Sequence, residues 1–255
     1  MQKLNVDGGF DGLDDFVVKM KLRSFAKKMT TMDFLQAIDD RHSVRRYTPM
    51  PLGDELVERL RDAVDECNAQ GGLHIQLVLD EPKAFDCWLA RYGKFSGVTH
   101  YFAMIGDKGI ERFDEQIGYY GEYLVLLAQT LGLNTCWVGL SYTKIPEALD
   151  LGVNEKLRCV IALGHGAEAG KKHHSKPIEK VVECEGEMPT WFKDGVVAAL
   201  KAPTAINQQK FKFSLLGDHQ VRARAGLGFY AKVDLGIVKR HFEIAAGIEN
   251  FSWAD

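Results

Sequence analysis

The sequence predicts a chain in which helices and strands are mixed, and three observations lead to that prediction. Residues 112–131 and 233–253 carry apolar side chains at helical spacing, and each run reaches a glycine near its end, as packed core helices do. Residues 100–107 and 157–166 are short runs of mainly apolar residues, which is typical of buried strands. The apolar fraction of 46% in 255 residues is enough for one large core or two smaller ones.

The segments around these four elements continue the mixture. Gly132 follows the first long helix, where a left-handed residue is needed and glycine has no steric penalty. Pro146 lies in the first turn of a short predicted helix, and Pro203 ends another. We expect further helices over residues 32–41, 55–68, 144–151 and 190–203, and further strands over residues 74–80 and 211–216.

The chain divides into an extension and two unequal parts. Residues 1–28 begin with a loose stretch containing Gly and Asp, and continue into a segment that fits one amphipathic helix suited to contact with a partner. The pattern of helices and strands restarts at about residue 186. We therefore expect the two parts to cover residues 29–185 and 186–255.

The two long helices resemble each other weakly. Setting Gly236 on Gly121 also sets Gly247 on Gly132, just past the end of each helix. Two core helices with similar ends can produce this echo by chance, so duplication and coincidence explain it equally well.

Composition argues against several classes of function. A formal net charge of -3 gives no whole-chain attraction to nucleic acid or to an anionic membrane. The longest apolar run is too short to span a bilayer, and the first residues lack the basic-then-apolar order of a signal peptide. The five cysteines form no C-x-x-C pair, which argues against a disulfide framework and a zinc site. We expect a cytoplasmic protein with reduced thiols and no metal.

A basic loop at residues 41–46 is the first candidate binding motif. Three arginines, a histidine and a serine crowd into six residues, and a terminal phosphate favours guanidinium forks beside a short hydroxyl donor. The alternative is a solvated loop whose arginines pair with carboxylates such as Asp39, Asp40 and Glu55. Composition alone favours the solvated loop.

A second candidate lies at residues 202–209, where three amide side chains follow Pro203. An amide both donates and accepts hydrogen bonds, so it suits the mixed carbonyl and N–H edge of a heterocycle such as the pyrimidine of a flavin. The alternative is a polar turn before the strand at 211–216, and this segment taken alone favours the turn.

Two further segments have weaker signals. Residues 132–139 are small and apolar after a helix end, so backbone N–H groups there can approach a planar ligand, although a capped helix followed by a buried tryptophan explains them equally well. Residues 170–177 are basic and suit a phosphate, but a charge run is more often a solvated face.

In combination and order, these motifs resemble the FMN-dependent nitroreductase family. The loop R-[RH]-S-x-[RK]-x-[FY] of that family matches Arg41, His42, Ser43, Arg45 and Tyr47. The family's G-L-G-x-x-x-x-G motif corresponds to GLNTCWVG, and its basic segment before Pro-Ile-Glu corresponds to KKHHSKPIEKV.

The chain departs from the family pattern at several positions. Asn134 replaces the second glycine of the glycine motif, and His173 and Ser175 lie where the family often has Lys or Arg. The motif A-P-S-x-x-N-x-Q, which normally follows soon after the first loop, appears as APTAINQQ at residues 202–209. This late position resembles the Thermotoga-type nitroreductases, in which one chain folds as a pseudo-dimer.

The resemblance implies an α+β fold with a central, mostly antiparallel sheet flanked by helices, in two unequal halves. It implies one complete flavin site per chain, in a monomeric pseudo-dimer or a weak homodimer. Helices around residues 82–98 and 217–231 would cover the flavin and set the substrate. FMN is the expected cofactor, at residues Arg41, His42, Ser43, Arg45, Trp137, Val138, Gly139, His173, Ser175, Pro203, Thr204, Ala205, Asn207 and Gln209.

The activity that the resemblance implies is transfer of hydride from NADH or NADPH through FMN to a nitroaromatic, a quinone or a similar small molecule. The hydride chemistry belongs to the flavin, so no catalytic side chain is expected. Two alternatives remain: a protein that only binds or stores FMN, and a flavin-modifying relative on the same fold.

Overall fold

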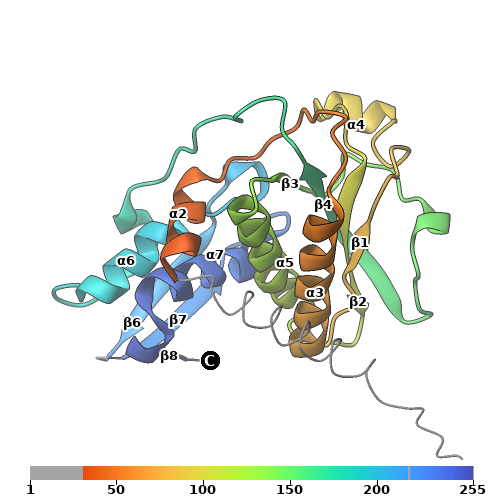
Figure 1. Cartoon of the computed structure of the whole chain (residues 1–255). Helices are drawn as coiled ribbons and strands as arrows, with labels where there is room; N and C mark the ends of the chain where they lie inside the picture. Colours follow the sequence, from red (N-terminus) through yellow and green to blue (C-terminus); the bar gives the residue numbers. More distant parts are fainter. Residues whose placement is uncertain (1–30, 218, 255) are drawn as a thin grey trace, which may run out of the picture.

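The computed structural model describes residues 31–217 and 219–254, so the helix expected within residues 1–28 lies outside the described part. Within the described residues, two four-stranded sheets lie on opposite sides of a central layer of helices (Figure 1). The α+β class is thereby confirmed, although each half has its own sheet where the resemblance implied one central sheet.

The first sheet is antiparallel throughout and has the order β1-β2-β4-β3. Side chains of its inner strand β2 alternate between two cores, as the period of a strand requires. Phe102 and Met104 pack into the core with the long helices, whereas Tyr101, Ala103 and Ile105 face a second core on the other side. The strands are β1 (Gln76–Val78), β2 (His100–Asp107), β3 (Asn134–Val138) and β4 (Glu155–Gly164).

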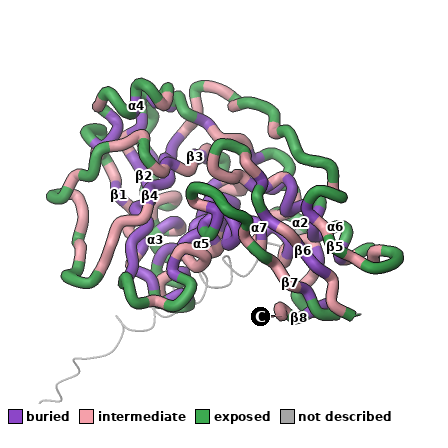
Figure 2. Tube along the Cα trace, turned by 180° about the vertical axis from the view of Figure 1, so that it is seen from behind, coloured by how far each residue is buried: buried purple, intermediate pink, exposed green. Residues whose placement is uncertain are grey.

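Helices α3 and α5 cover one face of this sheet, α4 packs with the core on its other face, and α2 packs against α5 and α7. The long helices α3 and α5 supply the apolar side chains of the larger core, and these residues are buried along the inner faces of the helices (Figure 2). The short helix α4 lies at the far end of the same sheet (Figure 1). The helices are α2 (Thr31–Asp40), α3 (Asp54–Gly71), α4 (Trp88–Tyr92) and α5 (Phe113–Thr130).

The second half contributes two helices and a mixed sheet of order β5-β6-β7-β8. Here β6 and β7 are antiparallel, while β5 and β8 add to them in parallel. Because β5 pairs with β6, this sheet begins before the boundary expected at residue 185. The elements are β5 (Val182–Glu183), α6 (Thr190–Ala199), β6 (Phe211–Leu216), β7 (Gln220–Ala225), α7 (Ala231–Ala246) and β8 (Ser252–Trp253).

Helices α5 and α7 join the two halves at a reciprocal crossing. A Cβ atom on Gly118 would lie 2.0 Å from the carbonyl oxygen of Val233, and one on Gly236 would lie 1.9 Å from that of Glu115. Neither position can hold a side chain without moving the backbone of the other helix. The glycines therefore set how closely the two halves approach.

Two expectations about local structure were wrong, and one strand was not predicted. The helix expected over residues 144–151 is only a short 3-10 turn, η1 (Pro146–Ala148), in a largely irregular connection. Residues 134–138, to which no element was assigned from the sequence, form β3. Residues 217–231, expected to be a helical cover, include β7, which is hydrogen-bonded to β6 along its whole length. β3 pairs with β4, from which a long connection separates it in the sequence, whereas β7 forms a hairpin with β6, the strand directly before it.

The ends of the two long helices agree with the sequence prediction. Gly132 has φ +76° and Gly247 has φ +77°, so both glycines adopt the backbone conformation that other residues rarely take. The remaining 3-10 turns are η2 (Ile178–Lys180), η3 (Ala205–Asn207) and η4 (Ile248–Asn250).

Candidate functional site

Two long connections run side by side (Figure 1): one joins α2 to α3 and contains residues 41–47, and the other follows β4. The Val44 N–H donates to the Thr135 carbonyl of β3 at 3.1 Å. The Ala167 N–H, in the other connection, donates to the Arg46 carbonyl at 2.8 Å. The basic loop is therefore held by backbone hydrogen bonds along the edge of the first sheet, and its conformation is not that of a free solvated loop.

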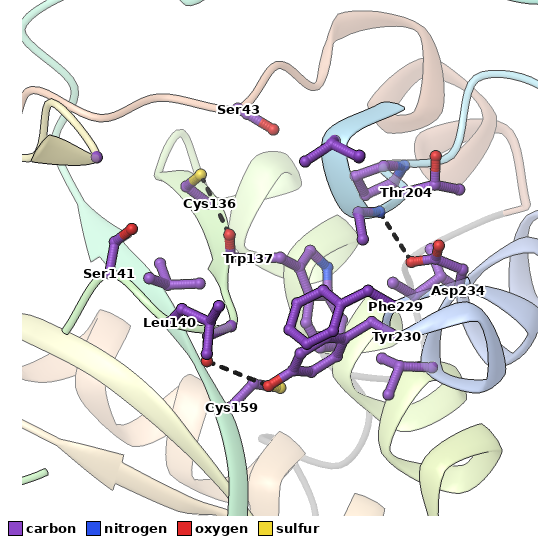
Figure 3. Close-up of a pocket in the computed structure, with 18 of the residues that line it drawn as sticks. Ser43, Cys136, Trp137, Leu140, Ser141, Cys159, Thr204, Phe229, Tyr230 and Asp234 are labelled. Carbon is purple, nitrogen blue, oxygen red and sulfur yellow. Dashed lines mark hydrogen bonds between the residues drawn. The ribbon is translucent and has the colours of Figure 1, made fainter. Parts of the chain in front are cut away.

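A cavity of about 370 Å³ lies where this loop, the end of β3, the turn after α6 and the start of α7 meet (Figure 3). Its volume is in the range of small-molecule sites, and both halves of the chain form its walls. Eight of the residues expected at FMN line it: Ser43, Arg45, Trp137, Val138, Gly139, Pro203, Thr204 and Ala205.

The two amides expected to read the flavin edge do not line this cavity. Asn207 Nδ2 donates to the His174 carbonyl at 2.9 Å, and Gln209 Nε2 donates to the same oxygen at 2.8 Å. Gln209 Oε1 accepts from the Lys176 N–H at 2.8 Å, so this buried amide is fully engaged. Their role in this structure is to fasten the 203–209 segment to the basic segment beside it.

His42, His173 and Ser175 also lie away from the cavity lining. Nδ1 of His42 lies 2.9 Å from the Asp40 carbonyl. His173 Nε2 and Ser175 Oγ both donate to the Leu200 carbonyl, at 2.7 and 2.9 Å, and so cap the end of α6. Burial lowers the pKa of His173, with the positive charge of Arg41 acting in the same direction. The neutral imidazole fits its bond to a carbonyl better than it fits a phosphate.

Arg41 does not line the cavity and is 5% exposed. Among the described residues its Nε has no hydrogen-bond partner, which is costly for a buried donor. Burial lowers the pKa of Arg41, and the charge of Glu122 opposes that shift. A buried guanidinium with unused donors is suited to bind an anion.

A buried polar network around Glu122 includes Trp137, a residue of the cavity lining. Trp137 Nε1 donates to Glu122 Oε2 at 2.8 Å, and His241 Nε2 lies 2.8 Å from Glu122 Oε1. The other ring nitrogen of His241 lies 3.1 Å from the Ala198 carbonyl. Glu122 and His241 are both fully buried, so this network ties β3, α5, α6 and α7 together directly behind the cavity wall.

The turn over the cavity has a strained backbone. Ile206, Asn207 and Gln209 have φ of +49°, +55° and +44°, a conformation that side chains disfavour. Such residues persist only where surrounding bonds hold them, and they concentrate at functional sites. Here the holding bonds are those of the two amides to residues 174–176.

Asp234, in the first turn of α7, is a cavity residue that sequence reasoning missed. Its carboxylate accepts from the Ala205 N–H at 3.0 Å (Figure 3), and also from Gln208 Nε2 at 2.8 Å. Burial raises its pKa to about 6, and the two hydrogen bonds only partly offset that rise. An aspartate three residues into a helix is common, so no signal in the sequence distinguished this one.

Tyr230, directly before α7, closes the cavity by contacting residues of the first half. Its hydroxyl donates to the carbonyls of Gly139 and Arg158, at 3.1 and 2.8 Å, and the Arg158 guanidinium lies 3.8 Å from its ring centre. A Cβ on Gly139 would lie 3.0 Å from the Tyr230 ring, so glycine lets the two halves close at this point.

The mouth of the cavity is apolar. Leu140, Ile206 and Phe229 line it, and their side chains are 65%, 94% and 56% exposed. Exposed apolar side chains gathered around one opening are typical of a binding site for an apolar or aromatic molecule.

Comparison with known proteins agrees with this geometry. Residues 33–246 match the family described as "Putative TM nitroreductase". The chain belongs to this family. The nitroreductase match covers most of the described structure, including the basic loop, β3, the 203–209 turn and α7.

One solved structure has the same fold, and a second is similar over part of the chain. A structure titled as a putative nitroreductase from Thermotoga maritima MSB8 has a TM-score of 0.60 and 18% identity, and the match covers 85% of each chain. Another, titled as a putative nitroreductase in complex with FMN from Desulfovibrio desulfuricans, has a TM-score of 0.49 and 24% identity, covering 61% of this chain and 98% of the other. No curated protein matches this chain.

Two further properties concern the whole described part. All five cysteines are free thiols. Within residues 31–217 and 219–254, no helix has the length and apolar character needed to cross a membrane.

Proposed function

We propose that this nitroreductase-family chain is an FMN-dependent oxidoreductase that passes hydride from NADH or NADPH to a nitroaromatic, quinone or similar acceptor. The observation that carries the proposal is the shared cavity: Ser43 and Arg45 from the basic loop meet Pro203, Thr204 and Ala205 from the second half around one space. These segments lie more than 150 residues apart, and the family resemblance assigned both to the same flavin.

The residues present fit FMN. Ser43, Arg45 and residues 137–139 would hold its ring from the first half, and residues 203–205 would hold it from the second half. Arg41 offers the buried donors that suit the phosphate, as its unpartnered Nε indicates. The amides of Asn207 and Gln209 would act indirectly, by holding the turn that forms the cavity wall.

When bound, FMN supplies the capacity to accept and donate hydride. The chain's own residues supply position and environment. Arg45 brings a positive charge to the cavity, which stabilises negative charge that develops there. The apolar side chains at the mouth reduce access of water and favour a flat organic molecule over a hydrated one.

We also propose that the chain is a pseudo-dimer with one flavin site, divided near residues 29–185 and 186–255. The reciprocal crossing of α5 and α7 supports this, because each helix presents a glycine to a carbonyl of the other in the same way. Five free thiols are compatible with a cytosolic location.

The visible spectrum of the purified protein tests the proposal. We expect the absorption of oxidised flavin, which disappears anaerobically on addition of NADH or NADPH and returns on addition of a quinone or nitroaromatic. A protein that stays yellow with both donors is a binding or storage protein. A protein that is colourless, and takes up no added FMN, would overturn the assignment.

A further inference from the structure

The crossing of α5 and α7 packs the two helices as a twofold axis would. A Cβ on Gly118 would meet the Val233 carbonyl oxygen, and a Cβ on Gly236 would meet that of Glu115. Gly236 therefore corresponds to Gly118 and Val233 to Glu115, with an offset of 118 residues in both pairs. Other residues at the start of α7 have their counterparts in α5 at the same offset.

This correspondence extends to a second cavity, of about 230 Å³, which includes the start of α5 and is named here the counterpart cavity. Four residues at the start of α7 line the cavity described above, and the counterparts of all four line this one. The pairs are Tyr230 and Arg112, Val233 and Glu115, Asp234 and Gln116, and Ile237 and Tyr119. Tyr230 and Arg112 also share a left-handed backbone, with φ of +61° and +57°.

A tryptophan lines each cavity from the strand that follows one of the two helices. Trp137 lies in β3, after α5, and its Nε1 donates to Glu122 of α5 at 2.8 Å. Trp253 lies in β8, after α7, and its Nε1 donates to Glu243 of α7 at 2.6 Å. The counterpart cavity thus takes its tryptophan from the second half and its helix start from the first, the reverse of the other cavity.

The counterpart cavity has a buried acceptor that no described residue satisfies. In the other cavity Asp234 accepts from the Ala205 N–H, whereas Oε1 of its counterpart Gln116 is buried without a hydrogen-bond partner among the described residues. Nε of Arg240 is a second such atom, and Nη1 of the same side chain donates to the Tyr119 hydroxyl at 2.9 Å. Buried polar groups are rarely left unsatisfied, so Gln116 indicates a site for a hydrogen-bond donor.

The charges that line the counterpart cavity are balanced. Arg112 and Lys239 are positive, and Glu115 and Glu243 are negative. Lys239 Nζ bonds to Glu115 Oε1, and Glu243 accepts from the side chain of Trp253. A neutral molecule therefore suits this cavity better than an ion does.

The remaining walls are aromatic. Tyr119, Tyr120 and Trp253 contribute their rings, which favour a flat apolar ligand. A cavity of about 150 Å³ is enough to hold benzene, so the counterpart cavity has room for one substituted ring. It is smaller than the cavity described above, of about 370 Å³, which we assign to the flavin.

We propose that the counterpart cavity binds a neutral aromatic molecule of one ring that carries an N–H or O–H donor. The ring lies against the tyrosines and Trp253, and the donor binds Gln116 Oε1. Arylamines and phenols have this chemistry. The site is separate from the flavin cavity, so the inference does not depend on the proposed function.

The test titrates the full chain with aniline and follows the indole N–H signals by NMR. Trp253 reports on the counterpart cavity and Trp137 on the flavin cavity, while Trp88 and Trp191 line neither. Loss of one signal in Trp253→Phe or Trp137→Phe assigns it. We expect aniline to shift the Trp253 signal saturably. Toluene, which is similar in size but has no donor, is expected to bind about tenfold more weakly.

Gln116→Leu removes the acceptor and keeps a side chain of similar size. We expect this variant to bind aniline no better than toluene, because the donor then has no partner. Gln129→Leu is the matched control, since Gln129 lies on the same helix and lines neither cavity. The control should keep the tenfold preference for aniline.

The same titration after addition of FMN separates this inference from the proposed function. A Trp253 shift that persists with FMN supports the counterpart cavity, and it does so equally in a protein that takes up no FMN, a result that overturns the proposed function alone. Aniline that shifts only the Trp137 signal, or no signal, would overturn the counterpart cavity. Equal affinities of the wild type for aniline and toluene would overturn the donor that we assign to the ligand.

Discussion

At the scale of single residues, the most informative side chains are those that are buried and polar and form no ion pair with another described residue. Arg41 is 5% exposed with an unpartnered Nε, and Asp234 is 3% exposed with only neutral hydrogen-bond donors. Burying a charge in this way costs free energy, and a fold that retains such groups usually uses them. Asp234 lines the cavity that the two halves share, and Arg41 is two residues from Ser43, which also lines it.

Arg41→Ala is expected to weaken FMN binding by about 1.5–3 kcal/mol, the usual contribution of a hydrogen bond to a charged group. Fluorescence titration of the apoprotein with FMN measures the loss, and riboflavin is the control ligand because it lacks the phosphate. Equal losses for both ligands would indicate that Arg41 only supports the fold. An unchanged affinity for FMN would show that its phosphate binds elsewhere.

Asp234→Asn is expected to raise stability at alkaline pH. The Asp234 pKa is about 6 in the fold against 3.8 for the free side chain, so folding favours the protonated form. The stability that the protonated Asp234 carboxyl contributes to the fold is complete below pH 3.8 and is lost as the pH rises through 6. Above pH 6 the ionised carboxylate therefore costs the wild type about 3 kcal/mol, a cost that asparagine does not have.

Urea unfolding at pH 8 and at pH 4.5 measures this difference. The stabilisation by Asp234→Asn should be largest at pH 8 and much smaller at pH 4.5. The oxygen of the new asparagine amide can still accept from the Ala205 N–H, but its nitrogen can donate to Gln208 only if that amide turns over, which removes the bond from Gln208 Nε2 to the Phe229 carbonyl at both pH values. The same gain at both pH values would mean that the effect comes from packing and not from the carboxyl charge.

At the scale of elements, the crossing of α5 and α7 decides how the halves meet. Gly118 and Gly236 contact each other's helix in the same way, which is how two copies related by a twofold axis would pack. The sequence echo placed Gly236 on Gly121, whereas the contacts relate Gly236 to Gly118, close to one helical turn earlier. The echo at the helix ends and the packing at the crossing therefore follow different registers.

Gly236→Ala is expected to destabilise the protein by about 1–3 kcal/mol or more, because its methyl group would overlap the Glu115 carbonyl oxygen. Gly53→Ala is the control, since a Cβ there meets nothing within 4 Å and its φ of -66° suits any residue. Chemical denaturation compares the two variants. Equal stability would mean that the helices separate at little cost and that the crossing does not hold the halves together.

At the scale of the whole molecule, one cavity is built jointly by the two halves. Loop residues at 43–45 and β3 come from the first half, and the 203–206 turn and α7 come from the second. Because each half supplies different segments, neither forms this site alone. The same unequal division argues for a single flavin per chain.

The expected stoichiometry is one FMN per chain. Flavin absorbance after release by denaturation, divided by protein concentration from amino-acid analysis, measures it directly. The molar mass from light scattering shows whether the chain is a monomer or associates. A ratio near two would contradict the pseudo-dimer, because a second complete site would then be required.

The sequence by itself determined much of this protein. Apolar periodicity located α5 and α7, and the glycines after them adopt the left-handed conformation that helix ends need. The order of motifs indicated the family, which residues 33–246 then confirmed. These features are local in the chain, so neighbouring residues are enough to specify them.

The tertiary structure alone decided how the site is assembled. The pairing of β3 with β4 depends on a partner beyond a long connection, and the burial of Asp234 depends on segments distant in the sequence; sequence patterns contain neither. Asn207 and Gln209 were expected at the ligand, but their amides are used to hold residues 174–176. An amide binds whichever donor or acceptor the fold brings within reach, and only the folded chain determines which one that is.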